Sequence, residues 1–256
     1  MDWAALIRAT LRLYATAALE TWQRIQRAWW VALLPFVYLL ILLVTSVFAA
    51  PLGLVGGFIL GFVLAMCSGS YLYFIAEVVQ GNRVQPRELL DSWRPYWGSV
   101  ISILFFVFIL RTLLGILVVP GQSSQTILSI INLVLLIILN PIPEIIYQGR
   151  SAGFAMLQES LDFLWDNGVE WFVPLVVLAV VSAVVLPLSI LAAPLEIGRL
   201  SFPTLFSGLL SGSPAALLVA ALNAGLLYVL MVFRGRLFRK LADSSRRQRL
   251  YRARFD

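Results

Sequence analysis

The chain of 256 residues has no histidine, a single cysteine at Cys67 and a single lysine at Lys240. The missing histidine excludes His-based catalytic triads, haem ligation by histidine and Cys–His zinc sites, and a lone cysteine excludes a disulfide framework. Charged residues are also scarce, at 12% of the chain, against about 25% in a soluble domain. Apolar residues make up 61%, and the mean hydropathy is +0.91. A chain of this composition cannot cover its surface with polar side chains, so we expect an integral membrane protein.

Long apolar runs support this expectation. A helix crosses a hydrocarbon core of about 30 Å with roughly 20 apolar residues. Six stretches have this length, at about residues 29–49, 54–79, 99–119, 127–147, 171–193 and 214–233. The sequence therefore predicts an all-α polytopic membrane protein with a six-helix transmembrane domain over residues 29–233.

The cations predict the orientation of these spans. Nearly all of the 19 Lys and Arg residues lie before the first span, between the second and third, between the fourth and fifth, or after the sixth. By the positive-inside rule, these four regions and both termini are cytoplasmic. The strong preference for Arg over Lys is typical of bacteria with GC-rich genomes, so we expect the bacterial cytoplasmic (inner) membrane.

An amphipathic segment precedes each odd-numbered span, which suggests an internal repeat. The first such segment is residues 1–28, predicted as an interfacial helix. Trp22, Trp93 and Trp165 mark the three segments at nearly constant spacing, and Asn167-Gly168 is a plausible end for the third interfacial helix. The pattern predicts three tandem hairpins, each preceded by a cytoplasmic amphipathic helix. Alternatively, any six-span protein with short outer turns has a rough periodicity of this size.

Part of the chain resembles a known group of membrane proteins. The relevant residues are the run Asn140-Pro-Ile-Pro-Glu144-Ile-Ile, the run Ala155-Met-Leu-Gln-Glu-Ser160 and the Trp-bearing segment that re-enters the membrane. Over residues 140–180 they resemble the six-span membrane domain of glycerophosphodiester phosphodiesterases and related bacterial integral membrane proteins. The soluble phosphodiesterase domain of that family has no counterpart here, so the resemblance implies a membrane module without catalysis.

Small residues recur at every fourth position of the second span. They are Gly53, Gly57, Gly61, Ala65 and Gly69. Such a stripe allows close approach of another helix. It predicts packing within the bundle, or alternatively contact with a partner or a second copy of the chain.

Polar residues inside apolar spans are the candidates for ligand binding or ion coupling, because a charge in the bilayer is costly. Arg111 lies within the third span, where it could bind an anion, snorkel outward or pair with Glu196. Glu77 and Glu144 occupy equivalent positions near the inner ends of their spans and could couple protons or cations, or simply face water or a neighbouring Arg. Asn140 begins a proline-containing break above Glu144, and broken helices form ion sites in transporters.

The chain ends in a basic tail, residues 234–256. We expect its cations to contact anionic lipid headgroups on the cytoplasmic side. These candidate lipid-contacting residues are Arg234, Arg236, Arg239, Lys240, Arg246, Arg247 and Arg249. No nucleic-acid-binding motif accompanies the basic run, so we expect no nucleic-acid partner.

We expect no catalytic residues, no metal site and no cofactor, because the chain offers no histidine base and no nucleotide-binding loop. The predicted function is a non-enzymatic structural, assembly or regulatory module of the membrane. The alternative is a transport component, such as a permease subunit partnered with a separate ATPase. A transport pathway would need a polar cavity where Arg111, Asn140 or Asn223 converge, whereas a scaffold would not.

Overall fold

The computed structural model describes residues 3–117, 122–148, 151–185 and 214–243. The α-helices are α1 (Trp3–Ile25), α2 (Leu34–Ala49), α3 (Leu54–Gln80), α4 (Trp97–Leu117), α5 (Gln122–Leu139), α6 (Ile142–Gln148), α7 (Ala155–Val185) and α9 (Pro214–Ala242). Short 3-10 segments lie at η1 (Trp29–Leu33), η2 (Ala50–Leu52) and η3 (Pro86–Leu90). No strand occurs in the described ranges, so the predicted all-α fold is confirmed for them.

Five helical stretches are long and apolar enough to cross a membrane, and the protein is therefore a multi-pass membrane protein. They are Trp29–Leu52, Leu54–Gln80, Trp97–Leu114, Thr126–Gln148 and Ala220–Ala242. Each overlaps one predicted span. The remaining predicted span, residues 171–193, begins within α7 and continues beyond the described residues. The six-span, three-hairpin arrangement therefore stays a prediction.

Glycines in positive-φ conformations mark both ends of α3. Gly53 (φ +55°) follows η2 and reverses the chain between α2 and α3. Gly81 (φ +90°) ends α3, and its N–H donates to the carbonyls of Glu77 and Val78. The N–H of Asn82 also donates to the carbonyl of Glu77. A left-handed residue with these bonds closes a helix and satisfies its last carbonyls, so α3 ends at Gly81.

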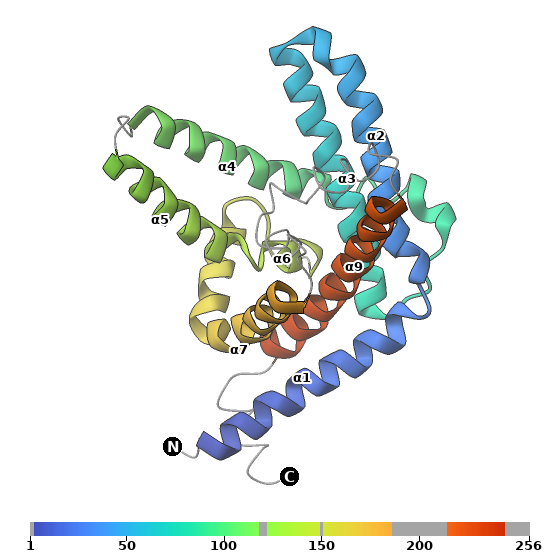
Figure 1. Ribbon diagram of the computed structural model, residues 1–256, viewed down its shortest axis with the longest axis vertical. Helices are drawn as coiled ribbons and strands as arrows, with labels where there is room; N and C mark the ends of the chain where they lie inside the picture. The colour runs from blue at the N-terminus through green and yellow to red at the C-terminus, as the bar shows by residue number, and fades with distance from the viewer. Residues whose placement is uncertain (1–2, 118–121, 149–150, 186–213, 244–256) are drawn as a thin grey trace.

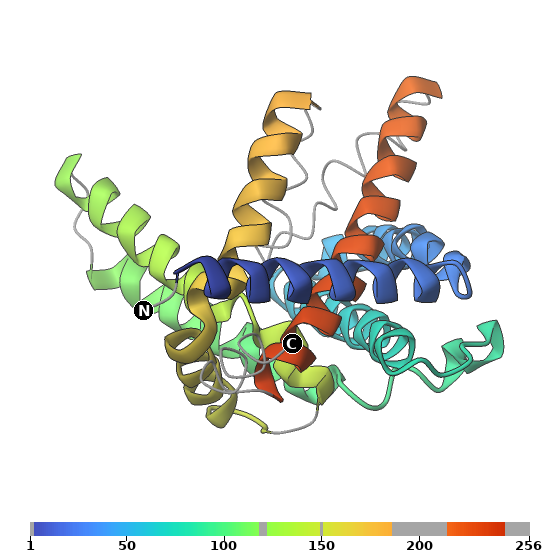
Figure 2. The same cartoon turned by 90° about the horizontal axis from the view of Figure 1, so that it is seen from below.

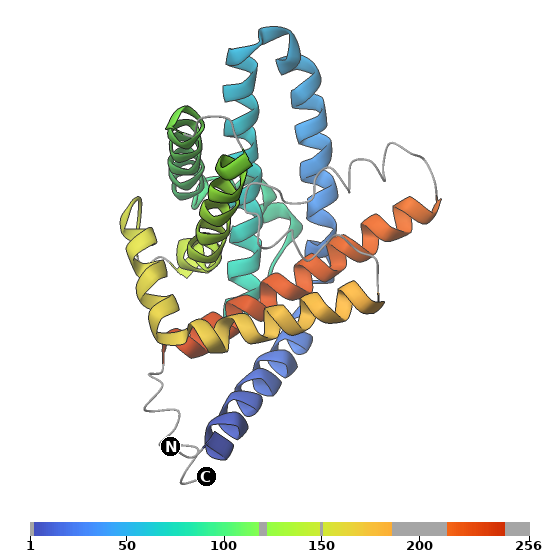
Figure 3. The ribbon, with the colours of Figure 1, turned by 60° about the vertical axis from the view of Figure 1, so that its left-hand side comes forward.

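α7 is longer than the sequence predicts. The predicted helix end at Asn167-Gly168 is wrong, because α7 continues through it to Val185, although Figure 3 shows that the helix is bent. A glycine inside a helix costs about 1 kcal/mol relative to alanine. Trp171, in the next turn, is fully buried and packs edge-on against Phe163 with ring centroids 5.4 Å apart. Burying a large apolar side chain contributes about 1.5–3 kcal/mol or more, which outweighs the glycine penalty.

α3 and α9 form the centre of the molecule. α3 packs along α2 and contacts α4, while α9 contacts α3 and α1 (Figure 1). Seen from below, α1 lies across α9 (Figure 2). α7 contacts α9 near the centre of the molecule, and the two helices diverge away from it (Figure 2). The central core contains side chains from α3, α6, α7 and α9, among them Phe74, Ile75, Ile142, Ile145, Met156, Trp171, Val232, Leu237 and Phe238.

Two parts of the molecule extend away from this centre, and we call them the α2–α3 arm and the α4–α5 arm (Figure 1). Their side chains include many large exposed apolar residues. Examples are Val47, Phe48, Leu54 and Phe58 on the first arm, and Phe105, Phe108, Ile130 and Leu133 on the second. In a membrane these surfaces face lipid or the helices of another protein.

The stripe of small residues in α3 does not form one packing face. A Cβ on Gly57 or Gly61 would meet nothing within 4 Å, and Gly53 belongs to the turn. Within the stripe, close approach occurs at Gly69, where a Cβ would lie 2.8 Å from the backbone nitrogen of Trp97. Beside the stripe, a Cβ on Gly56 would lie 1.9 Å from the carbonyl oxygen of Ala49. Ala65 is fully buried. The packing prediction therefore fails for the outer glycines, because α2 contacts a face of α3 offset by one residue from the stripe.

Candidate functional site

A proline-containing break divides the fourth predicted span into α5 and α6. α5 ends at Leu139 and α6 begins at Ile142. Pro141 has no N–H to continue the hydrogen bonds of α5, and Pro143 fits the first turn of α6 because that position needs no N–H donor. Glu144 follows in this first turn, where the positive end of the helix dipole favours a carboxylate.

Glu144 forms a buried ion pair with Arg234 of α9. Arg234 donates from Nε to Oε1 and from Nη2 to Oε2, both at 2.9 Å. The two side chains are 0% and 1% exposed. A two-bond geometry of this kind is the strongest arrangement for an arginine and a carboxylate. Their mutual attraction offsets part of the high cost of burying each charge, and the pair joins α6 to α9.

Asn140 and Trp171 complete the surroundings of this pair. Trp171 Nε1 donates to Asn140 Oδ1 at 2.7 Å, and the guanidinium of Arg234 lies 5.1 Å from the centroid of the Trp171 ring. The electron-rich face of an indole attracts a cation at this distance. Glu144, Arg234, Asn140 and Trp171 therefore form one connected group, which we call the Glu144–Arg234 network, and it joins the helix break to α7 and α9.

Side chains near the break also bind backbone carbonyls there. The carbonyl of Asn140 accepts a hydrogen bond from Arg234 Nη2, and the carbonyl of Ile138 accepts one from Ser160 Oγ. The carbonyl of Tyr147, in α6, accepts one from Tyr96. In transporters, carbonyls freed in this way coordinate the transported ion. Here the carbonyls of Ile138 and Asn140, next to the break, are bound by side chains of the chain itself.

A second polar group lies where α1 and α9 meet the end of α3. Glu20 pairs with Arg236 and with Lys240, the latter at 2.8 Å. Arg24 Nη1 donates to the carbonyl of Val78 at 3.1 Å, and Arg236 Nη1 donates to the carbonyl of Val79 at 3.2 Å. Cations at the C-terminal end of a helix interact favourably with its dipole. We call Glu20, Arg24, Arg236 and Lys240 the basic seam.

The basic seam carries a surplus of positive charge. Burial, and then the neighbouring cations Arg239 and Arg27, lower the pKa of Arg24. Arg27 is exposed at the surface, and Arg239 is about half exposed, with Asp243 at 3.9 Å. The seam is thus a patch where an anionic group would reduce repulsion between cations.

The predicted tail begins later than the sequence suggested. α9 continues to Ala242, because its last turns bury Leu237, Phe238 and Leu241 against the core. The assignment of Arg234 to a lipid-contacting tail is wrong, since this residue is buried in the Glu144–Arg234 network. Arg236 and Lys240 belong to the basic seam and Arg239 lies beside it, whereas Arg246, Arg247 and Arg249 lie outside the described residues.

The other predicted site residues do not converge. Arg111 is exposed on α4, and its proposed partner Glu196 lies outside the described residues. Glu77 accepts a hydrogen bond from the exposed Asn82 at 2.7 Å, so it is not equivalent to the buried Glu144. For Glu144, the alternative that it faces a neighbouring Arg is the one observed.

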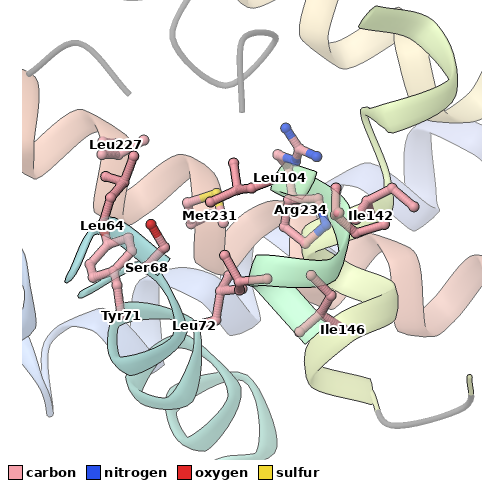
Figure 4. Close-up of a pocket in the computed structure, with 13 residues that line it drawn as sticks. Leu64, Ser68, Tyr71, Leu72, Leu104, Ile142, Ile146, Leu227, Met231 and Arg234 are labelled. Atoms are coloured by element: carbon pink, nitrogen blue, oxygen red, sulfur yellow. The ribbon is translucent and has the colours of Figure 1, made fainter. Parts of the chain in front are cut away.

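A cavity of about 80 Å³ lies between α3, α4, α6 and α9 (Figure 4). Its walls are mainly aliphatic, and the side chain of Arg234 borders it. Arg111, Asn140 and Asn223 are absent from its lining. The cavity therefore differs from the polar pathway that a transport mechanism built on those three residues would need.

No protein-family model, curated protein or solved structure matches the chain. The resemblance of residues 140–180 to the membrane domain of glycerophosphodiester phosphodiesterases thus stays a prediction from the sequence. The function has to be argued from the geometry of the described residues.

Several residues in these groups were not singled out from the sequence as site residues. Glu20 and Ser160 lie in ordinary amphipathic helices, and Trp171 was read only as part of a span. In the sequence, Arg234 is the first cation of the tail, and its depth in the membrane is the signal that indicates a buried partner. In the topology predicted from the sequence, Arg234 directly follows the last span and Glu144 lies near the inner end of the fourth.

Proposed function

We propose that this protein is a non-enzymatic module of the bacterial inner membrane with a structural, assembly or regulatory role, which binds lipid and partner proteins through its arms. The observation that carries this proposal is the division between core and surface. Charged side chains at the helix break bind one another and the backbone, while the arms expose large apolar side chains. In such a molecule the polar groups stabilise the fold, and the apolar surface is available to bind lipid or partner proteins.

Lipid contact on the cytoplasmic side is the second part of the proposal. The exposed side of α1 carries Leu11, Leu19 and Trp22, which are 59–64% exposed. The basic seam lies along the opposite, packed contact of α1 with α9. An apolar side with cations on the opposite side is typical of a helix that lies in the interface of an anionic membrane. This supports an orientation with α1 and the end of α9 in the cytoplasm.

The transport alternative has one structural argument, the helix break itself. That argument is weakened because the carbonyls of Ile138 and Asn140 are already bound. In addition, Arg111 is exposed on α4, away from the break and the cavity. The geometry therefore favours the scaffold role over a pathway through Arg111.

Site-specific photo-crosslinking in the native membrane tests the proposal. A benzophenone side chain replaces Phe58 on the α2–α3 arm, Phe108 on the α4–α5 arm, or Phe74 in the core as the matched control. Phe58 and Phe108 are 67% and 58% exposed, and Phe74 is fully buried. We expect a discrete protein adduct from at least one arm position and none from Phe74. Exclusively lipid adducts at both arm positions would contradict a protein-scaffold role.

Complementation of a deletion strain separates the two functions. Phe58→Ala and Phe108→Ala reduce arm surface without touching the core, so a scaffold should lose activity in these variants. Arg111→Leu should be silent for a scaffold. If Arg111→Leu abolishes complementation while the protein remains folded and the arm variants are silent, the transport alternative is correct.

A further inference from the structure

The cavity between α3, α4, α6 and α9 has a lining that points to a ligand from the membrane. The lining residues are Leu64, Ser68, Tyr71, Leu72, Val100, Ile103, Leu104, Ile142, Pro143, Ile146, Leu227, Met231 and Arg234. All of them belong to four of the stretches that can cross a membrane. The medium around these stretches is lipid. The cavity is open on part of its boundary, so acyl chains reach it more readily than water does.

An empty apolar cavity is unfavourable, because its lining atoms lack van der Waals partners on one side. A cavity with purely apolar walls stays free of water but takes up apolar molecules, and the walls here are mainly aliphatic. An engineered apolar cavity of about 150 Å³ accommodates benzene. The cavity here, at about 80 Å³, is large enough for a segment of one hydrocarbon chain but not for a whole lipid.

One polar group in the lining lacks a partner. Tyr71 is 6% exposed, and its hydroxyl has no hydrogen-bond partner among the described residues. The neighbouring hydroxyls are already bonded, because Tyr38 bonds to Ser70 at 2.7 Å and Ser70 bonds to Ser92 at 2.5 Å. A buried hydroxyl without a partner destabilises the protein unless a ligand or a water supplies the missing hydrogen bond.

The depth of Tyr71 indicates which part of a lipid could bond to it. Gly69, two residues before Tyr71, approaches the backbone of Trp97, where the span Trp97–Leu114 begins. The ring of Tyr38 lies edge-on to that of Tyr71 and to that of Trp93. Tryptophans at the end of a span mark the membrane–water interface. Tyr71 therefore lies near the level where glycerolipids carry their ester groups, and Leu64 and Leu104 lie deeper along their helices.

We propose that this cavity binds one acyl chain of a membrane glycerolipid. The ester carbonyl of this acyl chain accepts a hydrogen bond from the hydroxyl of Tyr71. The chain runs from Tyr71 toward Leu64 and Leu104. The bound lipid stabilises the contact between α3, α4, α6 and α9 whether or not the arms bind a partner protein.

The test compares lipid retention and thermal unfolding for the full chain, delipidated in detergent, with and without added palmitoyl-oleoyl-phosphatidylglycerol. A dialkyl ether analogue of the same lipid serves as the probe that lacks ester carbonyls. Native mass spectrometry counts the retained lipids. We expect the diacyl lipid to bind and to raise the unfolding temperature of the wild type more than the ether lipid does.

Two variants locate the lipid. Tyr71→Phe should raise the unfolding temperature without lipid, because it removes an unpaired buried hydroxyl, yet weaken diacyl-lipid retention by roughly 2- to 12-fold, the value of one neutral hydrogen bond. Leu104→Trp should fill the cavity and abolish retention. The matched controls are Tyr228→Phe, whose hydroxyl is already bonded to the carbonyl of Ala28, and Leu113→Trp, which lies exposed on the same helix.

The opposite results would overturn the proposal. Equal retention of diacyl and ether lipid by both the wild type and Tyr71→Phe would show that the hydroxyl contacts no ester. Retention of the lipid by a folded Leu104→Trp would show that the chain binds elsewhere. Tyr71→Phe preserves the shape of the side chain, so it tests the proposal even if Leu104→Trp does not fold.

Discussion

Arg234 reaches Glu144 across 90 residues of sequence and holds both of its carboxylate oxygens at 2.9 Å. The same guanidinium binds the carbonyl of Asn140 and lies over the ring of Trp171. A single side chain thus links α9 to the helix break and to α7. The stability of the centre of the molecule depends on this relationship.

Removing either partner of this pair should be costly. We expect Glu144→Leu or Arg234→Met alone to destabilise the protein by about 3–5 kcal/mol, because the remaining charge is buried without compensation. The double variant should be more stable than either single variant, since no charge is left unpaired. A double-mutant cycle of unfolding free energies in one detergent measures the coupling. Simple addition of the two single effects would contradict the assignment.

Gly235 should not tolerate a side chain. A Cβ at this position would lie 2.2 Å from the hydroxyl oxygen of Tyr147 and 2.6 Å from a methyl group of Val79. We expect Gly235→Ala to destabilise the protein by about 1–3 kcal/mol through overpacking, as measured by thermal unfolding. Gly225→Ala on the same helix is the control, since a Cβ there meets nothing within 4 Å. Adding Tyr147→Phe to Gly235→Ala should recover part of the loss, and no recovery would disprove the clash.

Glu20 should be important for the contact between α1 and α9. We expect Glu20→Gln to destabilise this contact by about 1 kcal/mol, the upper range for partly exposed pairs, because Arg236 and Lys240 both lose a carboxylate. Phosphatidylglycerol nanodiscs should reduce the loss relative to phosphatidylcholine nanodiscs, since anionic headgroups supply the missing charge. Glu77→Gln, which removes a carboxylate bonded to the exposed Asn82, is the control. An equal loss in both lipids would argue against lipid contact at the basic seam.

Tyr14 makes the contact between α1 and α7 sensitive to alkaline pH. Its hydroxyl donates to the carbonyl of Glu170 at 2.7 Å. Burial, and then the charge of Glu170, raise the pKa of Tyr14 from 10.0 to about 12. Because the folded state favours the protonated phenol, its contribution is complete below pH 10 and is lost as the pH rises toward 12.

Unfolding of wild type and Tyr14→Phe across this pH window measures the effect. The wild type should lose more stability than the variant between pH 10 and pH 12, since the variant has no phenol to ionise at this position. Titration of tyrosinate absorbance should also show one late-titrating group fewer in the variant. Parallel pH profiles for the two proteins would mean that Tyr14 contributes nothing through its hydroxyl.

The sequence predicts the membrane-crossing stretches well because length and hydropathy decide them locally. The same is true of the break at Pro141, which follows from a missing N–H. Contacts between distant helices cannot be predicted from such local patterns. The partner of Glu144 and the charges around Glu20 depend on how α9 crosses the other helices, and no local pattern specifies that crossing.

The glycines of α3 illustrate the same limit. Gly56 and Gly57 are neighbours in sequence, yet a Cβ on the first would clash with Ala49 while a Cβ on the second would meet open space. A four-residue repeat identifies a face of a helix, but it does not say which face the neighbouring helix uses. The observed contact follows from the turn at Gly53, which sets how α2 and α3 align.

The separation of Glu144 and Arg234 along the chain also has a consequence for biosynthesis. The carboxylate leaves the ribosome 90 residues before its partner, which at typical bacterial and eukaryotic translation rates is a delay of about 5–20 s. During this delay the nascent chain holds an acidic group at the membrane with no cation from α9 to neutralise it. The core is therefore complete only once α9 has been made. We expect membrane quality-control proteases to recognise a chain truncated before α9 through its unpaired Glu144.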